Sequence, residues 1–189
     1  KGIISDYKII LCTIDENELN EIVSKNKIIK TEVGDEKLDT DSEMLMKQIL
    51  VAKMINELNV RKVISYHASV KQAKQFIFGN KETLSLENII NNFVRSDNND
   101  FYFQHVNGCM PSGVRHQILS NFASSDIGII SNAKCLTEGV DVPEIDAVYF
   151  VDPKNSLVDI VQAIGRALRK PKDKESKIKS IILNNLPII

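Results

Sequence analysis

Short runs of apolar, β-branched residues alternate along this chain with segments that carry apolar residues at helical spacing. The runs are apolar throughout, and not only at every second position, which is typical of strands buried on both faces. The segments between them can form the helices that join neighbouring parallel strands. The sequence therefore predicts an α/β fold with a parallel central sheet and helices on both of its faces.

The positions of these elements follow from periodicity and from capping patterns. The expected strands are residues 7–14, 62–69, 101–106, 126–131, 146–151 and 178–183. The expected helices are residues 40–58, 70–78 and 114–122 and one helix within residues 81–100, with a helical turn at 133–136 and a last helix that begins near Ser156. Thr40 and Ser156 begin capping patterns, and Gly79 with Asn80 stops the second helix. Residues 15–40 are charged and weakly periodic, and fit a loop with one short helix.

Length and composition indicate one globular domain that spans residues 1–189. The chain is 43% apolar and 26% charged, which is ordinary for a folded protein of this size. Its formal net charge is −1, so any contact with nucleic acid has to depend on local basic groups. The chain begins without an initiator methionine, and we expect it to be a fragment of a longer protein.

The cysteines and the hydropathy indicate the cellular compartment of the protein. Cys12, Cys109 and Cys135 are scattered without metal-ligand spacing, so no metal site is expected and the thiols are expected to be reduced and packed. The sequence has no signal peptide and no apolar run near the length of a membrane span. These features favour a cytoplasmic protein without a membrane partner.

The stretch Q-A-I-G-R-A-L-R, from Gln162 to Arg169, has a polar face that the domain's own core does not explain. On a helix, Gln162, Arg166 and Arg169 lie opposite an apolar stripe, with Gly165 on their flank. A solvated basic face is the simplest interpretation, but a glycine inside a helix costs about 1 kcal/mol and usually has a reason. Gly165 would let a ligand approach two guanidiniums, which bind phosphate well.

A second pattern, G-x-D-x-P, precedes this helix. Gly139 lets the backbone approach a ligand, Asp141 offers a carboxylate to a ribose hydroxyl, and Pro143 fixes the exit from the turn. Taken alone, the pattern is equally well explained by an ordinary surface turn. Its place shortly before Q-x-x-G-R-x-x-R favours a joint function. Ligands of such folds bind at the carboxyl ends of the strands, so the loops after Ser69, Val106, Ser131 and Val151 should share one edge.

The order and spacing of these two patterns resemble motifs V and VI in the second RecA-like domain of superfamily 2 helicases. Residues 62–76 are similar to motif IV, and the run from His105 to Gly108 resembles the segment between motifs IV and V. The resemblance covers about residues 62–170 and, in wording, is greatest to restriction-type DEAD/DEAH helicases of bacteria and phages. It implies a RecA-like three-layer fold of the P-loop NTPase type.

The resemblance also implies roles for individual residues. Arg166 and Arg169 would reach the γ-phosphate of ATP, and Gln162 would lie near the phosphates and the attacking water. Gly139 and Asp141 would contact the nucleotide, with Gly165 beside it.

Nucleic-acid contacts are implied for the start of motif V, where either Ser131 or Asn132 would touch a backbone phosphate. Ser69 and Gly108 are secondary candidates for such contacts, and His67 and His105 are expected to be packed and not catalytic. DNA is the expected partner. An RNA substrate stays open, because these motifs contact phosphate and do not select the sugar.

Other parts of a phosphoryl-transfer site are not recognisable. The sequence contains no G-x-x-x-x-G-K-[ST] and no convincing Walker B pattern. ATP and Mg²⁺ would therefore be held mainly by a preceding RecA-like domain of the same polypeptide, and the isolated chain is expected not to hydrolyse ATP.

Two alternatives remain from other functional classes. The first is a non-catalytic nucleic-acid-binding or protein-binding module that keeps the fold. The second is another doubly wound enzyme, which would need a glycine-rich loop after the first strand, where the sequence reads Asp-Glu-Asn-Glu from Asp15.

Overall fold

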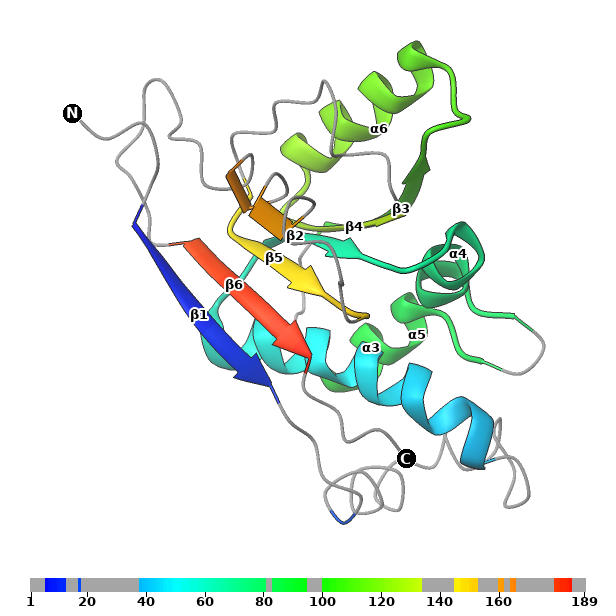
Figure 1. Cartoon of the computed structure of the whole chain (residues 1–189), viewed down its shortest axis with the longest axis vertical. Coiled ribbons are helices and arrows are strands. Elements are labelled where there is room, and N and C mark those ends of the chain that lie inside the picture. The colour runs from blue at the N-terminus through cyan, green and yellow to red at the C-terminus, as the bar shows by residue number, and fades with distance from the viewer. Residues whose placement is uncertain are drawn as a thin grey trace.

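Six parallel strands form the centre of the structure, a computed structural model that describes part of the chain (Figure 1). The described residues are 6–12, 17, 38–80, 83–94, 100–133, 145–152, 160–161, 164–165 and 179–184. The strands are β1 (Tyr7–Cys12), β2 (Lys62–Tyr66), β3 (Phe101–Asn107), β4 (Ile127–Ala133), β5 (Ala147–Phe150) and β6 (Lys179–Asn184). Their order across the sheet is β1-β6-β5-β2-β4-β3, and every neighbouring pair is parallel. The parallel sheet expected from the apolar runs is confirmed.

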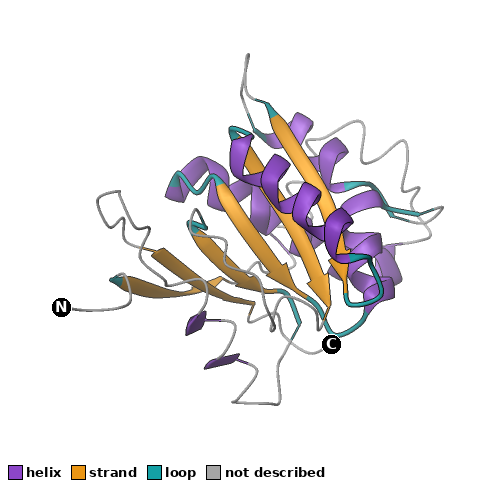
Figure 2. Cartoon of the chain, turned by 90° about the horizontal axis from the view of Figure 1, so that it is seen from above, coloured by secondary structure: helices purple, strands orange, loops and turns teal. Residues whose placement is uncertain are grey.

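Helices cover both faces of this sheet (Figure 2). The helices are α3 (Leu38–Leu58), α4 (Val70–Phe78), α5 (Leu86–Phe93) and α6 (Ser112–Ser124). One buried cluster joins α3, α4 and α5 to alternate residues of the strands, such as Val63 and Ile129. The other cluster joins α6 and the helical residues Ile160 and Ile164 to the opposite face, through Ile64 and Ile130. The three-layer arrangement predicted from the sequence is therefore confirmed.

Several element boundaries differ from the sequence prediction: β4 continues to Ala133, where a helical turn was expected to begin, and two other differences have clear physical reasons. The expected strand 62–69 ends at Tyr66, because Ser69 turns the chain as the N-cap of α4 and its hydroxyl oxygen accepts a hydrogen bond from Gln72 N at 3.2 Å. Helix α3 begins at Leu38, so Thr40 lies inside it and is not its cap. The predicted end of α4 is confirmed at Gly79, where φ is +67° and an added Cβ would lie 2.5 Å from Thr83 O.

Helix α6 is fixed to the sheet by a buried lysine and a glycine. Lys62 Nζ donates to the carbonyl oxygens of Phe122 and Ser125 and to Ser125 Oγ (2.9 Å), at the end of the helix. Gly128, which is paired with Lys62 in the sheet, leaves room for the Phe122 ring, since a Cβ there would lie 2.6 Å from Phe122 Cδ2. These contacts hold the helix that follows the β3 loop.

Candidate nucleic-acid interface

The carboxyl ends of β2, β3, β4 and β5 meet at one edge of the sheet. Asn132 is in register with both Tyr66 of β2 and Val106 of β3, and Tyr66 is in register with Phe150 of β5. The ends of these four strands therefore share the edge expected to bind ligands. Ser69, Gly108 and the pair Ser131 and Asn132 all come to it.

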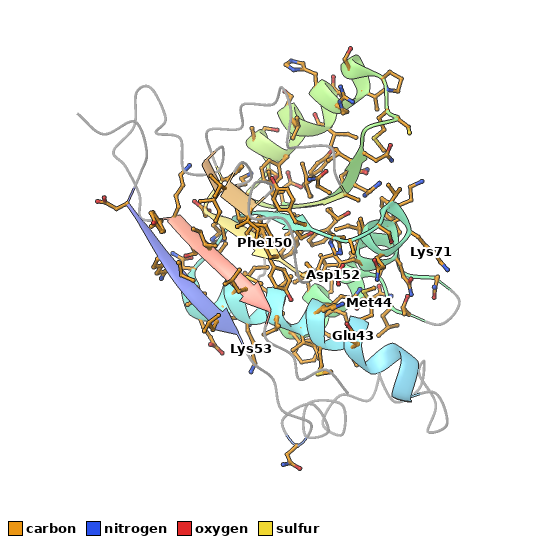
Figure 3. The ribbon with its side chains drawn as sticks, in the orientation of Figure 1. Glu43, Met44, Lys53, Lys71, Phe150 and Asp152 are labelled. Atoms are coloured by element: carbon orange, nitrogen blue, oxygen red, sulfur yellow. The ribbon has the colours of Figure 1, made fainter. Side chains whose placement is uncertain are left out.

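Ser69 is exposed at the start of α4. Besides accepting from Gln72 N, its hydroxyl donates to Gln72 Oε1 at 2.9 Å. Lys71 and Lys74 are exposed on the same helix, and Figure 3 shows Lys71 directed away from the sheet. An exposed hydroxyl at the start of a helix that also carries two exposed lysines is suited to contact with a nucleic-acid backbone.

Gly108 lies in the exposed turn after β3. A Cβ at this position would meet no described atom within 4 Å, so the glycine leaves its backbone open to close approach. Its carbonyl oxygen accepts a hydrogen bond from Arg115 Nη1 of α6 at 3.3 Å. The guanidinium of Arg115 is thereby held beside this turn, where it adds a positive charge.

Ser131 and Asn132 are each 0% exposed in β4. The Ser131 hydroxyl donates to Ala73 O at 2.7 Å, and the Asn132 carbonyl oxygen accepts from His67 N at 2.9 Å. Their expected contact with a phosphate stays a prediction. In this structure the hydroxyl of Ser131 links β4 to α4.

His105 extends this link to the loop after β3. Because the Ser131 proton points to Ala73 O, Ser131 Oγ accepts from His105 Nδ1–H at 3.1 Å. The other ring nitrogen, Nε2, then accepts from Asn107 Nδ2 at 3.2 Å, and Asn107 Oδ1 accepts from Cys109 N at 3.0 Å. This series of hydrogen bonds from Cys109 N to Ala73 O, which we call the His105 relay, connects the Gly108 turn to α4.

The His105 relay requires a neutral imidazole. Burial, and then the positive charge of Lys74, lower the pKa of His105 to about 4, although a hydrogen bond with the Ser131 backbone acts in the opposite direction. The ring is 1% exposed. The expectation that His105 is packed agrees with this burial. The spacing His105-x-Asn107 could have indicated the relay, because alternate residues of a strand share a face.

A buried ion pair lies at the same edge, between the end of β5 and α3. Asp152 Oδ1 accepts from Lys47 Nζ at 2.7 Å, and Lys47 also pairs with Glu43 at 2.6 Å. Figure 3 shows Asp152 over the part of α3 that carries Glu43, and both carboxylates pair with Lys47. Asp152 Oδ2 accepts from Ala68 N at 2.9 Å.

The charges of this pair stabilise each other. Burial lowers the pKa of Lys47, but its hydrogen bonds with Asp152 and Glu43 outweigh this and raise it above the ordinary value. Burial likewise raises the pKa of Asp152, but the bonds from Lys47 and Ala68 N lower it overall. Sequence reasoning missed this pair. Its one signal was the polar Lys47-Gln48 step within an apolar helix.

Comparison of the sequence with known proteins identifies its family. The family described as "Helicase conserved C-terminal domain" matches residues 46–171, which is more than half of the chain. The chain belongs to this family. The predicted membership in the C-terminal domains of superfamily 2 helicases is confirmed.

Relatives of this helicase C-terminal domain include two helicases from distant organisms. It is 30% identical over 139 residues to the probable helicase A859L of African swine fever virus (isolate Pig/Kenya/KEN-50/1950), covering 72% of this chain and 14% of the relative. It is 24% identical over 168 residues to the putative ATP-dependent helicase IRC3 of Saccharomyces cerevisiae, covering 88% of this chain and 24% of the relative. The domain therefore spans a small part of each relative.

Solved structures share its fold. The ATP-dependent Type ISP restriction-modification enzyme LlaBIII bound to DNA matches with a TM-score of 0.72 at 24% identity, covering 97% of this chain and 12% of that chain. Domain 2 of the DEAD-box helicase Mss116p bound to an RNA duplex matches with a TM-score of 0.54 at 17% identity, covering 77% of this chain and 50% of that chain. These likenesses confirm the RecA-like fold of the helicase C-terminal domain.

Most of the predicted nucleotide contacts of this domain lie outside the described residues. These are Gly139, Asp141, Gln162, Arg166 and Arg169. Gly165 is described: it is helical and exposed, and a Cβ there would meet no described atom within 4 Å. Packing against described parts of this domain therefore does not account for a glycine at this position.

No group of three or more His, Cys, Asp or Glu side chains in the described part of the chain is arranged to hold a metal ion. No described helix is both long and apolar enough to span a bilayer.

Proposed function

We propose that this domain is the C-terminal half of the motor of an ATP-dependent DNA helicase or translocase, and that the full-length protein is a restriction-type enzyme. The observation that carries the proposal is that Ser69 and Gly108 are both exposed at the carboxyl edge of the sheet, where α4 carries the exposed Lys71 and Lys74, and Arg115 is bonded to Gly108 O. The family match supports it, because residues 46–171 include both motif V and motif VI. The likeness of the fold to LlaBIII favours the restriction type and DNA.

In this proposal, the edge binds the backbone of a nucleic-acid strand. The hydroxyl of Ser69, the open backbone at Gly108 and the nearby cations contact phosphates. Ser131 or Asn132 of motif V, each 0% exposed in this structure, would contribute only after a local rearrangement. Phosphate contacts give position and affinity but no base specificity, so we expect little dependence on sequence. The formal net charge of −1 makes such binding depend on this local group of cations.

The nucleotide would bind between this domain and a preceding RecA-like domain of the same polypeptide, which would hold most of ATP and Mg²⁺. The arginines of motif VI would neutralise charge on the γ-phosphate in the transition state, a role worth 10³-fold to 10⁵-fold in related systems. The residues proposed on this side of the cleft are Gln162, Arg166, Arg169, Gly139, Asp141 and Gly165. Closing and opening of the cleft in each ATP cycle would move the bound strand.

The test is ATP turnover by the full-length protein without nucleic acid, with duplex DNA and with RNA. We expect DNA to stimulate turnover and Arg166→Ala to reduce the stimulated rate about 10³-fold or more. Arg61→Ala is the matched control, because Arg61 is exposed at the opposite, amino end of β2. It should keep the rate within about twofold.

The other outcomes identify the alternatives. Stimulation by RNA alone would indicate an RNA helicase. No turnover under any condition, or a rate that Arg166→Ala leaves unchanged, would refute the motor and favour a non-catalytic binding module. The isolated 189-residue chain should show no ATP turnover, because its sequence contains no P-loop.

A further inference from the structure

Asp152 joins three elements at the carboxyl edge through one carboxylate. It lies just after β5, receives a hydrogen bond from Lys47 of α3 on Oδ1 and another from Ala68 N, at the start of α4, on Oδ2. His67 Nδ1 is 3.9 Å from the same Oδ2 atom. The side chains of Asp152 and Lys47 are both buried.

Stability alone does not explain a buried ion pair at this place. Removing two charges from water costs several kcal/mol per ion, and apolar residues of similar volume often stabilise a fold as well or better. Glu43, the second partner of Lys47, is mostly exposed and adds little. The pair is better explained by the position that it gives to Ala68.

That position is the entry to α4. The pairing of β2 with β5 ends at Tyr66 and Phe150, followed by a hydrogen bond from Val151 N to Tyr66 O at 3.1 Å. The hydrogen bond from Ala68 N to Asp152 Oδ2 extends the link between the β2 and β5 segments beyond this last backbone hydrogen bond. It therefore fixes the residue that directly precedes Ser69, the N-cap of α4.

Helix α4 is also held one turn later. The Ser131 hydroxyl donates to Ala73 O, so β4 secures α4, while Asp152 of the β5 end secures Ala68, which directly precedes the N-cap. With two fixed points, the first turn of α4 has little freedom to tilt. Lys71, which lies in this turn, is held with it.

We propose that Asp152, oriented by Lys47, is a positioning residue that fixes Ser69 and the first turn of α4 for contact with a nucleic-acid backbone. Asp152 does not touch the nucleic acid itself, since its two oxygens are occupied within the protein. The inference rests on the proposed function. According to it, the Asp152 carboxylate increases the affinity of the domain for a nucleic-acid strand.

The test compares two double variants of the full-length protein, Lys47→Met/Asp152→Asn and Lys47→Met/Asp152→Leu. Both lack the two charges, so neither leaves a lone buried ion. Asparagine keeps an oxygen that can accept from Ala68 N, whereas leucine has a similar shape without an acceptor. The measured quantities are the nucleic-acid concentration that gives half-maximal stimulation of ATP turnover, the KM for ATP, and the melting temperature.

We expect the leucine variant to need about tenfold more nucleic acid for half-maximal stimulation than the asparagine variant, from the loss of one oriented hydrogen bond. The KM for ATP should agree within about twofold between the two. If the leucine variant does not fold, Asp152→Ala in the same Lys47→Met background removes the acceptor with a smaller side chain, and the same rise is expected.

If nucleic acid stimulates ATP turnover by the wild type but both variants need the same nucleic-acid concentration for half-maximal stimulation, the positioning role is overturned and the proposed function stays intact. A higher nucleic-acid requirement that is accompanied by a lower melting temperature and a higher KM for ATP would show a purely structural effect. This outcome would also overturn the positioning role. A wild type that no nucleic acid stimulates would refute the proposed function, and the inference would fall with it.

Discussion

Replacing His105 by asparagine should make the stability of the protein less dependent on pH while lowering it at neutral pH. The asparagine amide can donate to Ser131 Oγ from the place of Nδ1, but it does not reach Asn107. Asn107 Nδ2, in a buried residue, then loses its acceptor. An unsatisfied buried donor costs about 1–3 kcal/mol, so the wild type should be more stable by about 2 kcal/mol at pH 7.5.

The pH dependence follows from the lowered pKa of His105. Its pKa is about 4 in the folded state and near 6.5 in the unfolded chain, so the unfolded state binds more protons between these values. Stability that is present above about pH 6.5 is therefore lost as the pH falls toward 4. At pH 4.5 the wild type should have lost roughly 2–3 kcal/mol through this group, whereas the asparagine variant has nothing to titrate there.

The assay is urea unfolding of both proteins at pH 7.5 and pH 4.5, read as the difference in the free energy of unfolding. Contributions of other titrating groups cancel in that difference. The difference should shrink by about 2–3 kcal/mol at the lower pH. His116→Asn makes the same substitution at an exposed position of α6 and should change stability at pH 7.5 by no more than about 0.5 kcal/mol. If the free energy of unfolding differs between the wild type and His105→Asn by the same amount at both pH values, the neutral, buried His105 relay is refuted.

Two further predictions concern the attachment of α6. Gly128→Ala should lower the free energy of unfolding by about 1–3 kcal/mol, because the new Cβ would lie 2.6 Å from Phe122 Cδ2; a melting temperature equal to that of the wild type would contradict this packing. Lys62→Met should cost about 2–4 kcal/mol and speed amide exchange at the end of α6, since it removes the donor to the Phe122 and Ser125 carbonyls. The substitution Arg61→Met at the exposed neighbouring position is its control. Equal rates of amide exchange in both variants would argue against the role of Lys62 at the end of α6.

The fold could be predicted from the sequence because its signals are local. Uniformly apolar runs mark strands covered on both faces, and helical spacing marks the helices between them. Gly79 ends α4 where its positive φ requires a glycine. The boundary at Tyr66 was harder to predict, since the serine cap at Ser69 competes with an apolar run that could have continued as strand.

The candidate site was predictable only in outline. Because carboxyl ends of parallel strands share one edge, the sequence alone suffices to assign Ser69 and Gly108 to the same surface. Their exposure at that edge depends on the tertiary packing and could not be predicted. The same holds for the burial of Ser131, whose hydroxyl is bonded to Ala73 O.

The sequence by itself determined the parallel α/β architecture, the helicase family and the edge of the sheet to which Ser69 and Gly108 come. Only the tertiary structure decided how that edge is held together. Lys47 and Asp152 are 105 positions apart, and His105 and Ser131 are 26 apart. No local pattern links such pairs, because packing of the helices onto the sheet selects which buried polar groups become neighbours. A buried polar group must find a partner, but the sequence does not say which one.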